Sequence, residues 1–120
     1  GGNRGTNYHH EAVQAASGEL AAAGLPDRLM VDCSHGNSNK DYRRQADVLK
    51  AVAEQVRDGS RALMGVMLES HLVEGNQTLT SDLSQLSYGQ SITDACISIE
   101  TTRLLLKELA GSVRGLAVTA

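Results

Sequence analysis

Residues 62–68 read A-L-M-G-V-M-L, a stretch in which every residue is apolar or glycine. The stretch is too short for a typical helix, and its hydrophobicity does not alternate as in a strand with one wet face. Continuous hydrophobicity over this length is typical of a central strand in a parallel sheet, which is covered on both faces. A shorter run at residues 29–31, L-M-V, follows a turn and predicts a second buried strand.

Helical patterns flank both predicted strands. Residues 9–23 repeat apolar side chains at helical spacing until Gly24 stops the helix. Ser38 and Asp41 resemble a capping box that opens a second helix, whose apolar stripe ends before Gly59. Helices that alternate with buried strands are typical of a parallel α/β protein, either doubly wound or a barrel.

The C-terminal half predicts a long loop at residues 70–90, a third helix at residues 92–110 and a loose tail at residues 111–120. We find no domain boundary and expect residues 1–120 to form a single partial domain. Two parallel strands complete neither a sheet nor a barrel, and their bare edges would be marginal alone. Partner strands are therefore missing, or another copy of the chain supplies them. The absence of an initiator Met also suggests a fragment or a processed product.

Composition excludes several classes of function. The net charge of −3 gives no basic footprint for nucleic acid. No apolar run reaches the ~20 residues that span a bilayer, and the first residues lack the core of a signal peptide. Two cysteines are too few for a disulfide scaffold and fit a reducing cytoplasm.

Ionisable residues follow both predicted strands. The strand at 29–31 leads into D-C-S-H, which ends at His35, and the strand at 62–68 leads directly into Glu69. Ligands bind at the carboxyl ends of parallel strands in barrels and open sheets alike. Asp94 follows the long loop near a predicted helix start. One imidazole and two carboxylates would suit a divalent ion of the manganese, iron or zinc type.

Each candidate ligand could also have a purely structural role. His35 could be a hydrogen-bonded surface residue, and Glu69 could form a salt bridge. Asp94 could belong to a capping box with Ser91. The remaining polar or reactive residues are expected to be structural or solvated: Cys33 and Cys96 as small buried residues, His9 and His10 in solvent or as an unassigned ligand pair, His71 in a loop or behind the ligands, and Arg43 and Arg44 on a solvated helix face or near a phosphate.

Three segments resemble one enzyme family. Residues 32–40, D-C-S-H-G-N-S-N-K, resemble the D-x-S-H-x-N-S-x-K segment of the type I 3-deoxy-7-phosphoheptulonate (DAHP) synthases. Residues 65–77, G-V-M-L-E-S-H-L-V-E-G-N-Q, resemble their G-V-M-x-E-S-H-L-x-E-G-N-Q segment. Residues 88–96, Y-G-Q-S-I-T-D-A-C, resemble their Y-G-x-S-I-T-D-A-C segment. The three occur in the family's order.

The resemblance implies a (β/α)8 TIM barrel, of which this chain would supply the end of unit six and all of units seven and eight. A whole barrel needs ~250 residues. The resemblance also implies that a divalent metal is held by His35, Glu69 and Asp94, with an upstream Cys as fourth ligand. Neither Cys33 nor Cys96 matches that position. The substrate-binding residues that the family carries upstream are not assigned here.

The implied reaction condenses phosphoenolpyruvate with erythrose 4-phosphate at the start of the shikimate pathway, which leads to chorismate and the aromatic amino acids. The metal acts on the aldehyde oxygen as a Lewis acid, the enol carbon attacks, water adds and phosphate leaves. The resemblance implies a cytoplasmic transferase and a homo-oligomer. The 120-residue chain alone is expected to be inactive. Two alternatives are a self-associating or metal-binding module without activity and a related 3-deoxy-octulosonate 8-phosphate synthase.

Overall fold

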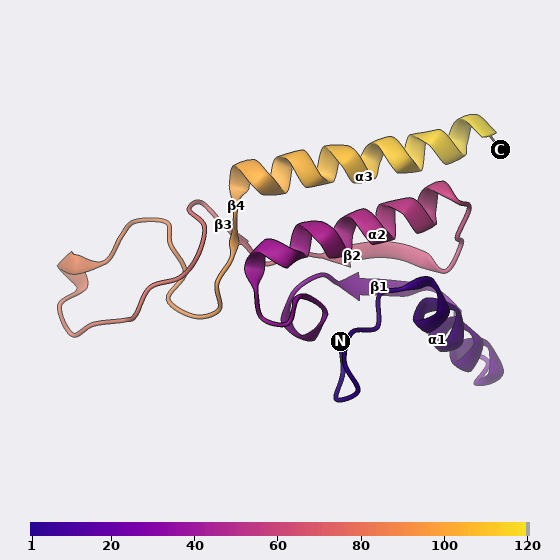
Figure 1. Cartoon of the computed structure of the whole chain (residues 1–120), viewed down its shortest axis with the longest axis horizontal. Helices are drawn as coiled ribbons and strands as arrows, with labels where there is room; N and C mark the ends of the chain where they lie inside the picture. Colours follow the sequence, from indigo (N-terminus) through magenta and orange to yellow (C-terminus); the bar gives the residue numbers. More distant parts are fainter. Residues whose placement is uncertain (120) are drawn as a thin grey trace.

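The computed structural model describes residues 1–119 as a chain of alternating helices and strands (Figure 1). The elements follow one another in the order α1 (His10–Ala22), β1 (Leu29–Asp32), the 3-10 helices η1 (His35–Ser38) and η2 (Tyr42–Arg44), α2 (Gln45–Arg57), β2 (Leu63–Met67), β3 (Ser70–His71), the 3-10 helix η3 (Leu83–Gln85), β4 (Ile97–Ser98) and α3 (Ile99–Thr119). The mixed α/β class and both expected strands are confirmed.

The strands pair in parallel, as the sequence predicts. β1 lies beside β2, with Asp32 opposite Met67 at the carboxyl ends of the two strands. β3 and β4 form a second parallel pair. Only Leu68 and Glu69 separate β2 from β3, so one extended stretch of chain pairs first with β1 and then with β4. The carboxyl end of β1 and the junction between β2 and β3 therefore lie at the same end of the β1–β2 pair (Figure 1).

The helices bury one face of the β1–β2 pair. Helices α2 and α3 run side by side along the strands (Figure 1). The core beneath them is aliphatic, as the lack of Phe and Trp requires, and comprises Val13, Val31, Cys33, Val48, Leu49, Val52, Val56, Ala62, Leu63, Ile97 and Leu105. The opposite face is open within the described residues: Met30 is 61% exposed and Met64 60%. Helices thus cover only one of the two faces of the apolar stretch at residues 62–68.

The expected start of the last helix is wrong. We predicted a helix from residue 92, but residues 91–96 form a loop and Ile97 begins the short strand β4. Ile97 is 2% exposed and packs in the core as a strand residue. The helix begins at Ile99, where the Ser98 hydroxyl accepts a hydrogen bond from the Thr101 amide at 3.2 Å and so satisfies a free N–H of the first turn.

Two further local predictions differ from the structure. The helix continues through Gly111 to Thr119, where we expected a loose tail, because a glycine costs a helix only about 1 kcal/mol. The Ser38 and Asp41 capping box does not form. The Ser38 hydroxyl donates to the His35 carbonyl, and the Asp41 carboxylate instead caps the 3-10 helix η2 through the Arg43 amide. Among the described residues, no helix combines the length and apolarity that crossing a membrane requires.

Candidate metal centre

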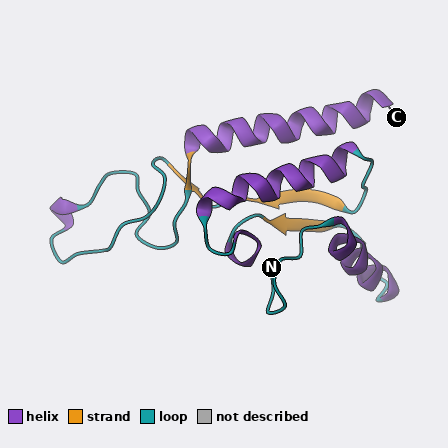
Figure 2. Ribbon diagram, viewed as in Figure 1, coloured by secondary structure: helices purple, strands orange, loops and turns teal. Residues whose placement is uncertain are grey.

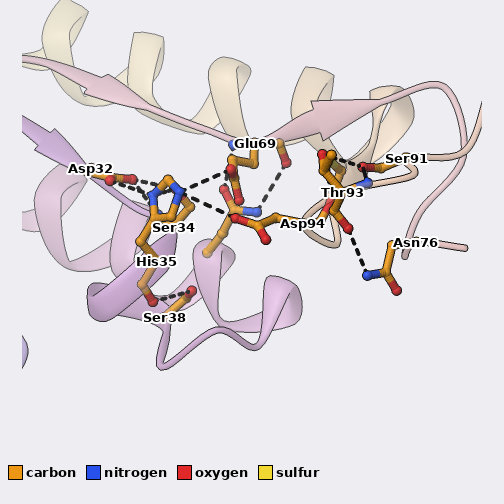
Figure 3. A network of polar contacts seen from close by, with 11 residues as sticks. Asp32, Ser34, His35, Ser38, Glu69, Asn76, Ser91, Thr93 and Asp94 are labelled. Carbon is orange, nitrogen blue, oxygen red and sulfur yellow. Dashed lines mark hydrogen bonds and ion pairs between the residues drawn. The ribbon is translucent and has the colours of Figure 1, made fainter. Parts of the chain in front are cut away.

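His35 stands just beyond the end of β1, at the start of η1. Its backbone adopts a φ of +51°, a left-handed conformation that non-glycine residues rarely take. Its Nδ1 lies 2.8 Å from Oδ2 of Asp32, and its ring is half exposed. The other carboxylate oxygen, Oδ1, accepts hydrogen bonds from both the amide and the hydroxyl of Ser34, at 2.8 and 2.5 Å. Figure 3 shows the imidazole held on this side by Asp32.

Glu69 occupies the break between β2 and β3, where the main chain turns from one partner strand to the other. The side chain of Gln45, at the start of α2, replaces the missing strand partner. The Glu69 amide donates to Gln45 Oε1 at 2.8 Å, and Gln45 Nε2 donates to the Glu69 carbonyl at 3.1 Å. That carbonyl also accepts from the Ile97 amide of β4 at 3.0 Å. Gln45 is fully buried, and through it and Ile97 the elements α2 and β4 together fix the main chain of Glu69.

Asp94 comes from the long loop between β3 and β4, which Figure 2 shows extending away from the sheet. The loop is tied back just beside Asp94. Gly75 and Cys96 exchange two backbone hydrogen bonds of 2.8 and 3.1 Å, and Asn76 Nδ2 donates to the carbonyl of Thr93 at 2.9 Å. The alternative role of Asp94 in a capping box is wrong, because Ser91 Oγ accepts from the Thr93 amide in a turn that precedes no helix.

The three predicted ligands meet although they lie far apart in the sequence. His35 Nε2 is 3.2 Å from Glu69 Oε1 and 3.6 Å from Asp94 Oδ2 (Figure 3). One donor atom from each of the three residues lies within 4.8 Å of the others. Donor atoms that bind one divalent ion at about 2.0–2.2 Å lie roughly 3–3.5 Å apart. The donor set and its spacing therefore fit a divalent metal ion.

The charges around His35 are predominantly negative. The hydrogen bond to Asp32, followed by the charges of Glu69 and Asp32, raises the pKa of His35 above its usual value. Partial burial raises the pKa of Glu69, and the nearby Asp94 adds to this, although His35 opposes it. Partial burial would raise the pKa of Asp32, but hydrogen bonds from Ser34 and His35 outweigh it and lower that pKa. Such a cluster favours a cation between its members.

A small cavity opens beside the three donors. Its volume is about 290 Å³, and its lining comprises His35, Ser38, Lys40, Tyr42, Gln45, Glu69, Asn76, Asp94 and Ala95. Lys40 adds a positive group to this lining and has a φ of +61°. A cavity with a lysine beside a cluster of two carboxylates and an imidazole suits a small anionic ligand that also contacts a metal.

The other residues considered from the sequence do not join the cluster. His71 Nδ1 accepts a hydrogen bond from the amide of Leu72, just after β3, and Arg43 lies 4.9 Å above the Tyr42 ring. Cys33 is fully buried, and burial, helped by the charge of Asp32, raises the pKa of its thiol to about 12. It is therefore a core residue, as expected. His9 immediately precedes α1, and the centre of its ring lies 4.2 Å from that of Tyr8.

Sequence reasoning missed two residues that hold the ligands in place. Asp32 precedes His35 by three residues, and that spacing within the D-x-S-H segment was an available signal. Gln45 gave no signal, because a glutamine in the first turn of an amphipathic helix reads as a solvated residue.

Parallel strands that present His35 and Glu69 beyond their carboxyl ends, with Asp94 beside them on a loop, define an α/β protein with a candidate metal site at the ends of its strands. The family model of the DAHP synthetase I family matches residues 1–107. The chain belongs to this family.

Named relatives agree with this assignment. The chain is 47% identical over 114 residues to the Tyr-sensitive phospho-2-dehydro-3-deoxyheptonate aldolase of Enterobacter agglomerans, covering 95% of this chain and 54% of the relative. It is 48% identical over 114 residues to the Tyr-sensitive aldolase of Escherichia coli K12, covering 95% of this chain and 32% of that protein. The solved structure of the Francisella tularensis aldolase superposes with a TM-score of 0.90 at 42% identity, over 96% of this chain and 33% of the other. The chain thus spans between a third and about half of these proteins.

Proposed function

We propose that this chain forms the metal-binding part of a transferase that condenses phosphoenolpyruvate with erythrose 4-phosphate, giving DAHP and phosphate. The observation that carries the proposal is the meeting of His35, Glu69 and Asp94 at 3.2 and 3.6 Å. Family membership over residues 1–107 supports the choice of reaction.

The fold that we propose for the whole enzyme is a (β/α)8 barrel, with β1 ending unit six, β2 and β3 forming the strand of unit seven, and β4 with α3 forming unit eight. The parallel order of these strands supports this arrangement. So does the open apolar face, where Met30 and Met64 are each about 60% exposed. In a barrel, such a face lies in a packed interior. Strands from outside residues 1–120, in the same polypeptide or in a second copy, would cover it.

In this proposal His35, Glu69 and Asp94 hold a divalent ion of the manganese, iron or zinc type, with a fourth ligand from outside residues 1–120. The bound ion would supply Lewis-acid polarisation of the aldehyde oxygen. The chain's own residues prepare the site: Gln45 fixes the main chain of Glu69, and Lys40 offers a positive group at the cavity beside the donors. The two free cysteines are consistent with the cytoplasmic location that we propose. A homo-oligomer, which the family resemblance implies, is also part of the proposal.

Metal binding can be tested on the 120-residue chain itself. Calorimetric titration with Mn²⁺ should show one site, and His35→Ala, Glu69→Gln and Asp94→Asn should each weaken binding at least tenfold, because each removes one of three donors. His10→Ala, which removes an exposed imidazole outside the cluster, is the matched control and should bind as the parent does. Equal binding by all four variants would refute the site.

The reaction can be tested in a chimera in which this chain replaces the matching third of the Escherichia coli relative. We expect phosphate release with phosphoenolpyruvate and erythrose 4-phosphate, and little release with arabinose 5-phosphate. The chimera that carries His35→Ala should release no phosphate with either aldehyde. The 120-residue chain alone should give no product. A folded, metal-binding chimera that prefers arabinose 5-phosphate would favour the octulosonate synthase. One that uses neither aldehyde would favour a metal-binding or self-associating module without activity.

A further inference from the structure

The imidazole of His35 has two differently occupied sides. Its Nδ1 faces the Asp32 carboxylate at 2.8 Å, whereas its Nε2 faces Glu69 and Asp94. The ring is half exposed, and its backbone is in the left-handed region. Packing against neighbours therefore does not fix the ring. Asp32 and Ser34 hold the ring in place on its Nδ1 side.

Hydrogen-bond accounting favours one ring nitrogen as the carrier of the proton. The Oδ1 atom of Asp32 already accepts from the amide and the hydroxyl of Ser34, so its Oδ2 is left for His35. An ionised carboxylate can only accept hydrogen bonds. The hydroxyl of Ser34 spends its single hydrogen on Asp32, so at 2.9 Å from Nδ1 it too can only accept. Both neighbours of Nδ1 thus require an N–H there.

A neutral imidazole carries one proton, so a proton on Nδ1 leaves the lone pair on Nε2. That lone pair faces the carboxylates of Glu69 and Asp94 at 3.2 and 3.6 Å, and these also only accept hydrogen bonds. The contact of Nδ1 with Asp32 is shorter, at 2.8 Å, so the single proton of the neutral ring favours Nδ1, and a cation is the partner that suits the lone pair on the other side. Metal-ligating histidines commonly donate their second N–H to a carboxylate, which fixes the tautomer and makes the ligand more basic.

We propose that Asp32 is a positioning residue for the metal: it holds His35 as the Nδ1–H tautomer, with Nε2 free to donate to the ion. The inference rests on the proposed function, because it presupposes that His35 binds a metal. Asp32 itself does not contact the ion. Ser34 supports it by occupying the other carboxylate oxygen, so that the carboxylate cannot rotate away from the ring.

The replacement Asp32→Asn tests the proposal most directly. An amide has one acceptor oxygen, and the two hydrogen bonds from Ser34 claim it. The amide NH₂ then faces Nδ1 and favours the opposite tautomer, with the proton on Nε2. We expect Mn²⁺ affinity to fall by about 10- to 100-fold. Asp32→Ala leaves the tautomer free and should reduce affinity less. Asp27→Asn removes the same charge from an exposed position at the other end of β1 and should leave affinity unchanged.

Nitrogen NMR of the metal-free chain gives a readout that a general structural role would not move. Two-bond ¹H–¹⁵N correlations of His35, recorded where the ring is neutral, should identify Nδ1–H in the parent chain and Nε2–H in Asp32→Asn. The parent spectrum tests the proposal even if a variant fails to fold, because an Nε2–H ring there would overturn it.

The two levels of failure can be told apart. If the parent chain binds Mn²⁺ and the folded Asp32→Asn variant binds within threefold of it, the role of Asp32 is refuted and the metal site stands. If the parent chain binds no Mn²⁺, the metal site fails, and the role of Asp32 fails with it.

Discussion

The replacement Gln45→Ala should destabilise the chain more than its position at the beginning of a helix suggests. Its side chain is fully buried and makes two hydrogen bonds with the main chain of Glu69, at 2.8 and 3.1 Å. The alanine variant removes both bonds. The Glu69 carbonyl keeps its bond from Ile97, so it stays satisfied, but the Glu69 amide loses its acceptor.

The size of the effect follows from these contacts. A partly buried donor left without an acceptor costs about 1–3 kcal/mol. Truncating a fully buried side chain also leaves a cavity, which adds about 1–2 kcal/mol for a loss of this size. We therefore expect the free energy of unfolding to fall by about 2–5 kcal/mol. With a urea m-value of about 2 kcal/mol/M, the unfolding midpoint should fall by roughly 1–2.5 M.

Urea unfolding followed by circular dichroism measures this loss, and amide hydrogen exchange locates it. The Glu69 amide should exchange faster in Gln45→Ala. The matched control is Gln55→Ala on the same helix. Gln55 donates to the Tyr8 carbonyl, but its Oε1 is buried without a partner among the described residues, so its removal should cost at most about 1 kcal/mol. Equal losses in the two variants, or an unchanged Glu69 exchange rate, would refute the reasoning.

Three further predictions concern single residues. Burial raises the pKa of Cys33 to about 12, so a thiol reagent at pH 8 should label it at least tenfold more slowly in the native chain than in urea. Gly89 has a φ of +76°, and a Cβ there would lie 2.8 Å from the Cβ of Leu72. Gly89→Ala should therefore lower the free energy of unfolding, measured in urea, by about 1–3 kcal/mol. As the control, Gly18→Ala, in open space within α1, should raise it by about 0.5–1 kcal/mol. In the metal-free chain, NMR should find the pKa of His35 above the ordinary value of about 6.5, and this pKa should fall in Asp32→Asn. Because the folded pKa is raised, the stabilisation of the folded chain by protonated His35 is complete below about pH 6.5. It disappears as the pH rises through the folded pKa.

The strands were predictable because both apolar runs are continuous and too short to form typical helices. The run at 62–68 contains β2, and the run at 29–31 starts β1. The parallel pairing followed from the helix between them. The candidate ligands His35 and Glu69 were also accessible, because both follow a strand, and parallel strands bring their carboxyl ends together.

The region after the long loop was not predictable in the same way. Strand β4 contains only Ile97 and Ser98, too few residues to show a period of two. Its neighbours Ala95 and Ile99 fit a helical spacing, so the pattern extended the helix backwards. The bonds that define the strand come from β3, 27 residues earlier in the chain for the Ser70 and Ile97 pair, and no local pattern records such a partner.

The arrangement also accounts for why the ligands can be recognised from the sequence while the residues that orient them are hard to find. His35, Glu69 and Asp94 are each held in place by another residue of the fold. Asp32 contacts the ring of His35, Gln45 bonds the main chain of Glu69, and Asn76 ties the loop beside Asp94. A ligand must present a particular donor atom, so its identity is restricted and visible. A residue that fixes a main chain needs only one acceptor and one donor at the right place. The fold, rather than the sequence pattern, decides which glutamine or aspartate meets that requirement.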